Sequence, residues 1–220
     1  MTPTRTRHGL AAALCALLAT ACSVLPAPEP LDVYLLPATN KAATDASAPR
    51  AWSLRIARPD ASGQLVGQRI LVVPEPNRMS VYKGASWHEP TPLLVRNRIF
   101  DAFRADGRVS ALSTEEMRTF ADFELASDLS AFHSEYRAGT KSPDAVIRLD
   151  TRLVDTASRR IVASRVFEAR QNAADTSVAA VVTAFGAAAD RLAAELVAWA
   201  VTQADTARET TAHTAPVSPP

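Results

Sequence analysis

Few side chains in this sequence of 220 residues have the chemistry of an active site, and the most distinctive of them is a thiol near the start. The chain contains two cysteines, Cys15 and Cys22. A cysteine can serve as a nucleophile, as a metal ligand or as the acceptor of a lipid. Cys15 lies within an apolar stretch, which leaves Cys22 as the candidate for modification.

The residues that precede Cys22 are typical of a secretory signal peptide. Arg5 and Arg7 open the chain, and an apolar run from Leu10 to Ala21 follows. That run is shorter than the roughly 20 apolar residues that span a bilayer. We therefore expect residues 1–21 to be a signal peptide that is cleaved between Ala21 and Cys22.

The segment Leu17–Cys22 resembles a lipobox, the motif at which a diacylglyceryl group is attached to the cysteine thiol. Ala19 stands where leucine is more usual, and the alternative is an ordinary signal peptide with an incidental Cys22. Ser23 follows, rather than the aspartate that retains lipoproteins in the inner membrane. Resemblance to sorted lipoproteins then implies the inner leaflet of the outer membrane. Residues 22–30 contain alternating prolines and are predicted to form an extended tether.

The other polar motifs lack features that catalysis or cofactor binding would need. Ser86 lacks the second glycine of a nucleophile elbow, and Gly139–Ser142 lacks the Gly-Lys pair of a phosphate-binding loop. His88 and His133 share no metal-ligand spacing, and no cysteine of the domain can assist them. The sequence therefore predicts a non-enzymatic protein with no metal and no cofactor apart from the lipid on Cys22.

Two groups of charged residues leave their roles open. The carboxylates are Asp122, Glu124, Asp128 and Asp150, and the arginines are Arg148, Arg152, Arg159 and Arg165. Paired carboxylates could act as acid and base, but nothing selects a pair. The arginines could form a basic patch on a hairpin or belong to an ordinary solvated sheet face. The formal net charge of +1 gives no reason to expect a nucleic-acid partner.

Hydrophobic periodicity predicts a single α/β domain over residues 31–203, followed by a disordered tail over residues 204–220. Strands are expected over residues 32–36, 52–56, 69–73, 122–132, 145–154 and 160–169, of which the last two should form a hairpin. Helices are expected from Thr91 to Gly107 and from Asp175 to about Gln203. This order of elements fits helices packed on a mixed β-sheet, as in a single-domain α/β sandwich.

Two of these elements carry details that a structure can check. The strand over residues 69–73 is apolar in its last four residues, as in a strand covered on both faces, and Pro74 and Pro76 are expected to end it. The middle helix should turn one apolar face to the sheet and its polar residues away. The apolar face consists of Val95, Ile99, Ala102 and Phe103, and the polar residues are Arg96, Asn97 and Arg104.

The segment Leu65–Gly107 carries the most recognisable pattern. It contains a strand, a Tyr-x-x-x-x-Trp turn formed by Tyr82 and Trp87 around Gly84, and Pro92 at the opening of a helix. With Tyr34 upstream, this order resembles the ABC-type transport auxiliary lipoproteins, the PqiC-like family. Together with the lipobox, the resemblance covers nearly all of residues 22–203. We favour core packing over ligand contact as the role of the two aromatic residues.

The resemblance implies a non-catalytic periplasmic component of a lipid-transport system that contains an MCE-domain protein and, often, an ABC transporter. It also implies an α/β sandwich that forms a homo-oligomeric ring and docks at the outer-membrane end of the MCE assembly. Two alternatives stay open at this point. One is a periplasmic lipid-binding shuttle with its own apolar cavity, and the other is a structural lipoprotein of the cell envelope.

Overall fold

The computed structural model describes residues 30–38 and 49–214, and the side chains of the final helix are described as far as residue 210. Met1–Leu31 and Asp32–Pro220 are separate units, and the second is described here by itself. The predicted signal peptide, its cleavage site and Cys22 lie outside the described residues, as do nearly all of the tether and residues 215–220.

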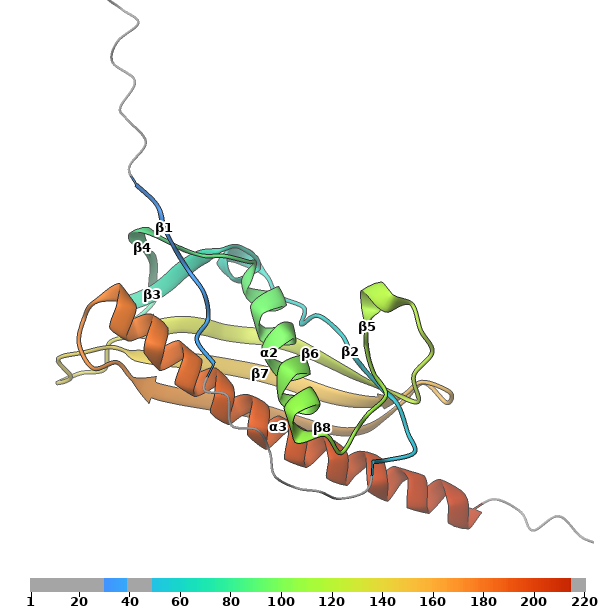
Figure 1. Cartoon of the computed structure of the whole chain (residues 1–220). Coiled ribbons are helices and arrows are strands. Elements are labelled where there is room, and N and C mark those ends of the chain that lie inside the picture. The colour runs from blue at the N-terminus through green and yellow to red at the C-terminus, as the bar shows by residue number, and fades with distance from the viewer. Residues whose placement is uncertain (1–29, 39–48, 215–220) are drawn as a thin grey trace, which may run out of the picture. The chain divides into compact units, whose positions relative to one another are not determined.

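The described strands form one mixed, eight-stranded sheet (Figure 1). The strands are β1 (Asp32–Tyr34), β2 (Leu54–Ile56), β3 (Arg69–Glu75), β4 (Arg78–Trp87), β5 (Leu112–Thr114), β6 (Phe123–Glu135), β7 (Asp144–Asp155) and β8 (Arg160–Asn172). One path through the sheet runs β1-β4-β3-β6-β2-β5, and β7 joins β6 to β8. Two short 3-10 helices, η2 (Gly63–Val66) and η3 (Glu115–Met117), lie in the connections.

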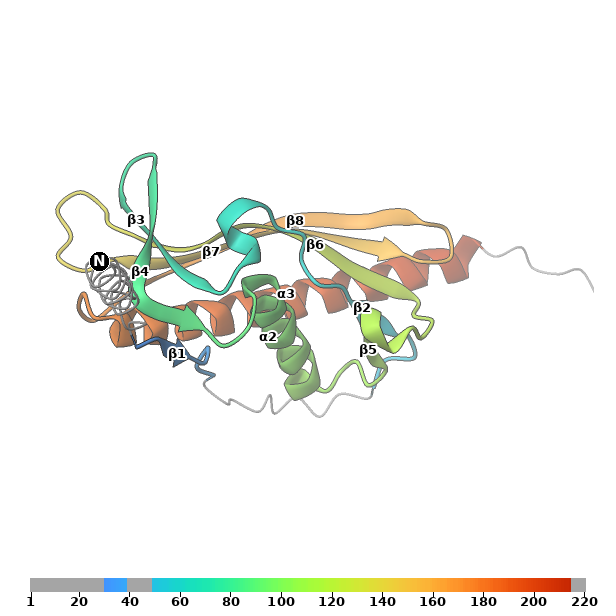
Figure 2. The same cartoon turned by 90° about the horizontal axis from the view of Figure 1, so that it is seen from above.

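Strand β6 is the central strand of the sheet, because three other strands pair with it. One of its edges pairs with β7 along its whole length, in antiparallel fashion. Its other edge is shared, because β2 pairs with its start (Leu54 opposite Phe123) and β3 with its end (Val72 opposite Ser134). A register shift between Leu129 and Ala131 bends the strand between those two partners. The sheet therefore curls at both ends (Figure 2).

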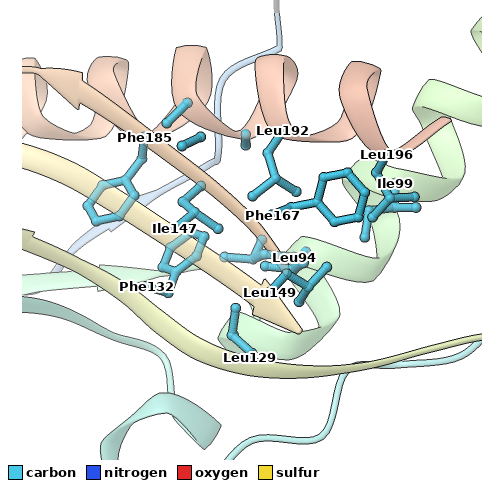
Figure 3. Packing of buried hydrophobic residues seen from close by; sticks show 14 of the residues in the cluster. Leu94, Ile99, Leu129, Phe132, Ile147, Leu149, Phe167, Phe185, Leu192 and Leu196 are labelled. Carbon is cyan, nitrogen blue, oxygen red and sulfur yellow. The ribbon is translucent and has the colours of Figure 1, made fainter. Parts of the chain in front are cut away.

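Two helices, α2 (Thr91–Asp106) and α3 (Val178–Thr214), lie on the concave side of this sheet (Figure 2). Their apolar faces and the inner faces of the strands form one hydrophobic core, part of which is drawn in Figure 3. Phe185 and Leu196 of α3 and Ile99 of α2 are at most 2% exposed. The alanines of α3 allow the helix backbone to approach the strands closely, and burial of this face stabilises the whole domain.

The predicted fold class is confirmed, and most predicted elements occur within a few residues of their expected positions. Strands β4 and β5 were missed. The β4 sequence contains Gly84 in a left-handed conformation (φ 69°), where the pairing with β3 changes register, so no unbroken alternation marks it as a strand. Strand β3 continues through Pro74 to Glu75, because its ladder with β4 is already irregular there.

The predicted end of the domain was wrong, because α3 continues beyond Gln203 to Thr214. Val201 and Ala204 are at most 1% exposed, so the apolar face does not stop where periodicity becomes weak. Asp205 accepts hydrogen bonds from Arg50 Nε and Trp52 Nε1, both 2.9 Å long. These bonds tie the last turns of the helix to the segment that enters β2.

The prediction that Arg96 points away from the protein was also wrong, whereas Val95, Ile99 and Phe103 are buried as expected. Arg96 is only 8% exposed and donates to Glu116 at 2.5 Å. Its neighbour Arg98, also buried, pairs with Asp190 of α3 and donates to the carbonyl oxygens of Leu36 (3.0 Å) and Pro37 (2.5 Å). Periodicity identifies the apolar face but cannot show a guanidinium that tertiary partners keep inside.

Candidate functional site

The residues that carry the family pattern meet where β1, β4 and the start of α2 come together. Trp87 is 1% exposed and packs edge-on against Phe132 of β6 and Phe185 of α3, with ring centroids 5.7 and 5.5 Å away. Phe132 and Phe185 are stacked at 4.7 Å. The indole Nε1 has no hydrogen-bond partner among the described residues. Trp87 is therefore an aromatic residue of the core with a structural role.

Three other residues of the pattern stabilise the structure around Trp87. Tyr34 lies opposite Trp87 in the parallel pairing of β1 with β4, and its carbonyl oxygen accepts a hydrogen bond from the His88 N–H. The Tyr82 hydroxyl is 2.9 Å from Ser134 Oγ, and burial raises the pKa of Tyr82 above its usual value. Pro92 occupies the first turn of α2, where its missing N–H costs nothing.

The side chains considered for catalysis do not converge in the described part of the chain. Ser86 is 7% exposed and has no hydrogen bond to a histidine among the described residues. His88 lies 3.6 Å from Glu89, and His133 lies 3.4 Å from Glu135, so each histidine has a local carboxylate, and neither ring is hydrogen-bonded to a hydroxyl among the described residues. Among the described residues, no three His, Cys, Asp or Glu side chains are grouped to hold a metal ion.

The four hairpin arginines singled out in the sequence do not form a free basic patch. Arg148 pairs with Glu168 at 3.1 Å, and Arg152 pairs with Asp128 at 2.6 Å, across the strands of the outer sheet face. Arg165 lies over the ring of Phe167. These contacts favour a solvated sheet face, and they leave Arg159 as the member of the set without such a partner among the described residues.

The same face extends to a chain of charges at the end of β8. The Arg170 guanidinium pairs with both Glu135 and Glu168. Hydrogen bonds from Arg170 and Arg148 hold the pKa of Glu168 below its usual value, and the bonds that Arg170 donates to Glu135 and Glu168 raise the pKa of Arg170. Oppositely charged neighbours across strands contribute modestly to sheet stability. The face is polar and internally satisfied, which is typical of a surface in water.

Two hollows occur on the described surface. One, of about 390 Å³, is polar and lies on the outer face beside Arg55, Arg58, Asp60 and Glu124. Arg55 and Glu124 pair with each other there, and Glu115 accepts hydrogen bonds from the Arg58 backbone N–H. The other, of about 670 Å³, is an open groove between α2 and α3 lined by alanines and by charged side chains in equal number. Neither is an enclosed apolar cavity of the kind that holds a lipid.

These features define a class of protein: a small α/β domain whose helices cover one side of a curled sheet and whose candidate catalytic side chains do not come together among the described residues. No helix in the described part of the chain has the length and apolar character needed to cross a membrane. The sequence pattern marks a structural junction, and nothing described around it has the arrangement of an active site.

The chain belongs to the ABC-type transport auxiliary lipoprotein component family, whose model matches residues 34–197. An uncharacterized protein of Bradyrhizobium diazoefficiens is 34% identical over 151 residues, which are 68% of this chain and 39% of that protein. The chain therefore spans about two fifths of the length of this relative. The resemblance predicted from Tyr34, Tyr82, Gly84, Trp87 and Pro92 is confirmed at the level of the family.

Solved structures agree with this assignment. A Xanthomonas campestris protein of the DUF330 family is 30% identical, with a TM-score of 0.75, over 81% of this chain and 99% of the other. A second crystal structure, of an uncharacterized protein, has a TM-score of 0.55 at 16% identity over 83% of this chain and 99% of that one. The second likeness shows the fold alone.

Proposed function

We propose that this protein is a non-catalytic lipoprotein that anchors an MCE-type lipid-transport assembly to the outer membrane of the cell envelope. Membership of an auxiliary transport lipoprotein family carries the proposal. The lipobox that ends in Cys22 supplies the anchor, and Ser23 behind it favours the inner leaflet of the outer membrane. Two or three acyl chains on one residue make release from a bilayer very slow.

The described domain fits a role in binding rather than in reaction. Its histidines and carboxylates are dispersed or ion-paired, which supports the absence of enzymatic activity and of any cofactor beyond the covalent lipid. Its core is filled by aromatic and aliphatic side chains. A domain with a packed core offers its surfaces to partners, here an MCE-domain protein and further copies of the same chain in a ring.

The direct test is association with the MCE-domain protein. The full chain, tagged at its C-terminus, is purified from detergent-solubilised envelopes of its host, and the MCE-domain protein should be retained with it. A matched Cys22→Ala variant separates anchoring from binding, because it should leave the membrane fraction yet still bind the solubilised partner. Failure of both forms to retain an MCE-domain protein would refute the proposal.

A lipid-binding shuttle is the principal alternative, and it makes a different prediction. The domain without its acyl chains, purified from a phospholipid-containing extract, should release phospholipid in native mass spectrometry if it is a shuttle. The hollows described above are open and partly polar, so we expect no stoichiometric phospholipid. A structural envelope lipoprotein would bind neither phospholipid nor an MCE-domain protein.

A further inference from the structure

Two neighbouring connections at one end of the domain expose large apolar side chains to solvent. Phe120 is 78% exposed and Met117 is 53% exposed, both between β5 and β6, and Ile161 at the start of β8 is 58% exposed. A phenylalanine ring left almost wholly in water forgoes the free energy of burial that such side chains usually gain. Residues 115–122 and 156–161 are called the distal tip below.

Hydrogen bonds join the two halves of the distal tip. The Thr156 N–H donates to the Asp122 carbonyl oxygen at 3.0 Å, and the Thr156 hydroxyl donates to the carbonyl oxygen of Ala121. Arg208 of α3 also forms an ion pair with Asp122. Figures 1 and 2 both show the connection after β5 beside the turn between β7 and β8, at the end of the sheet opposite β1.

The distal tip is fixed to the rest of the domain. Glu116 pairs with the buried Arg96 of α2 at 2.5 Å, and hydrogen bonding to Arg96 lowers the pKa of Glu116 to about 2. Asp122 accepts hydrogen bonds from the N–H (2.8 Å) and hydroxyl (2.7 Å) of Ser53. The exposed side chains are therefore presented from an anchored backbone.

The distal tip also carries positive charge that nothing described neutralises. Arg118, Arg159 and Arg160 are exposed and have no ion-pair partner among the described residues. Each acidic group in the two connections is engaged by another group. Glu115 and Glu116 face Arg96, Asp122 faces Ser53 and Arg208, and Asp155, at the start of the turn, accepts from Ser158.

Backbone conformation gives no reason for arginine at two of these positions. Arg118 and Arg159 have φ values of 51° and 57°, in the left-handed region that glycine or asparagine occupies with less strain. An arginine in such a turn is better explained by its side chain than by its backbone. Both guanidinium groups lie in the same short connections as Phe120 and Ile161.

We propose that the distal tip binds the surface of a phospholipid bilayer that contains anionic headgroups. Exposed Phe, Met and Ile side chains can enter the boundary between headgroups and acyl chains, while arginines pair with phosphates above it. Anionic lipid attracts each nearby arginine additively. The tip consists of two projecting turns, so it suits an extended surface better than a small ligand that must be enclosed.

This contact would set the orientation of the domain on the membrane. Helix α3 runs between the two ends of the domain and has 37 residues, about 55 Å at 1.5 Å per residue. If Cys22 is lipidated, as proposed above, the tip meets its bilayer at high effective concentration, so that even weak affinity suffices. The domain would then lie along the membrane. This consequence rests on the proposed lipid anchor, whereas the binding itself does not.

The test uses the chain from residue 22 with Cys22→Ser, which contains no cysteine. A single new cysteine carries a fluorophore that brightens and shifts to the blue in apolar surroundings, at Thr119→Cys in the tip. The matched control is Ala138→Cys, an exposed position in the turn between β6 and β7. Vesicles contain phosphatidylethanolamine with phosphatidylglycerol, or phosphatidylcholine alone.

We expect the label at residue 119 to respond to vesicles with phosphatidylglycerol and the label at residue 138 to remain unchanged. Phe120→Ser should weaken partitioning about tenfold, as the loss of most of one buried aromatic side chain predicts. Arg159→Glu with Arg160→Glu should abolish the preference for anionic lipid and its dependence on salt.

Three results would overturn the proposal: no response at residue 119, equal responses at residues 119 and 138, or unchanged partitioning of the Phe120→Ser variant. Circular dichroism of each variant excludes unfolding as the cause of a loss. If the same tip variants instead lose the MCE-domain protein while vesicles never bind, the occupant of the tip is an acidic protein surface. The vesicle assay contains no partner protein, so its failure is distinguishable from failure of the proposed function.

Discussion

The two ends of the domain share one hydrophobic core and differ in the contacts that accompany it. At the β1 end, the rings of Trp87, Phe132 and Phe185 pack in the core, and all three residues are at most 1% exposed. At the distal end, Asp205 and Asp122 anchor α3 and β2 through hydrogen bonds and ion pairs that are partly open to water. Apolar packing contains no titrating group and no charge that salt could screen. Partly exposed charge pairs are weakened by salt, which screens them, and by acid, which protonates their carboxylates.

The contacts at the two ends should therefore contribute differently to the stability of the domain. At the β1 end, the ring contacts join β4, β6 and α3, so we expect the stability of the whole domain to depend strongly on them. At the distal end, hydrogen bonds and ion pairs fix an outer segment of the chain. These contacts add less to the free energy of unfolding, because each partly exposed bond contributes little net stability. The distal end nevertheless has buried aromatic residues of its own, because the rings of Trp52 and Phe123 pack edge-on with centroids 5.6 Å apart. The exposed side chains of the distal tip lie outside this packing.

The largest effect should come from Trp87→Ala at the β1 end. Removing a fully buried indole leaves a cavity beside the stacked rings of Phe132 and Phe185, and we expect a loss of about 3–5 kcal/mol in the free energy of unfolding measured with urea. Trp87→Phe is the control. It keeps an aromatic ring and removes an N–H without a described partner, so the loss should stay below about 1.5 kcal/mol.

An intermediate effect is expected from Asp205→Ala at the distal end. The substitution removes the acceptor of the Trp52 indole N–H and one acceptor of Arg50, at a cost of about 1–3 kcal/mol. Amide exchange should accelerate in β2 and in the last turns of α3, but not around Phe185. Thr206→Ala, on the exposed side of the same turn, is the matched control and should be close to neutral. A larger loss than that of Trp87→Ala would reverse the proposed contrast between the ends.

The smallest effect is a dependence on pH confined to the distal end. Burial favours a higher pKa for Asp122, but hydrogen bonds from Ser53 and the nearby Arg208 outweigh it, and the folded pKa lies below the usual value. A depressed folded pKa contributes stability above the pKa of the unfolded chain, and this stability is lost as the pH falls through the folded value.

Acid titration of amide exchange should therefore show β2 and residues 115–122 opening as the pH falls below about 4, before β4 does. Asp122→Asn should reduce that acid sensitivity, with a change of about 1 kcal/mol at neutral pH. If β4 and β2 open together at every pH, the two ends are one cooperative unit and the contrast fails.

The sequence determined the elements whose residues agree with one another locally. Helix α2 begins at Thr91-Pro92 and ends before Gly107, which has a φ of 75°, and the hairpin of β7 and β8 alternates around a turn. The order of these elements sufficed for the fold class. The residues Tyr34, Tyr82, Gly84, Trp87 and Pro92 sufficed for the family, because their order and spacing along the chain resemble its pattern.

Only the tertiary structure decided the features that depend on partners distant in sequence. The helix beyond Gln203 is polar enough to read as a tail, yet Asp205 binds Arg50 and Trp52, more than 150 residues away. Arg96 is buried because Glu116 neutralises it. The exposure of Phe120 is likewise invisible in sequence, since an apolar residue before a strand normally signals core. Local pattern fixes which residues can be buried, and long-range pairing selects which of them are.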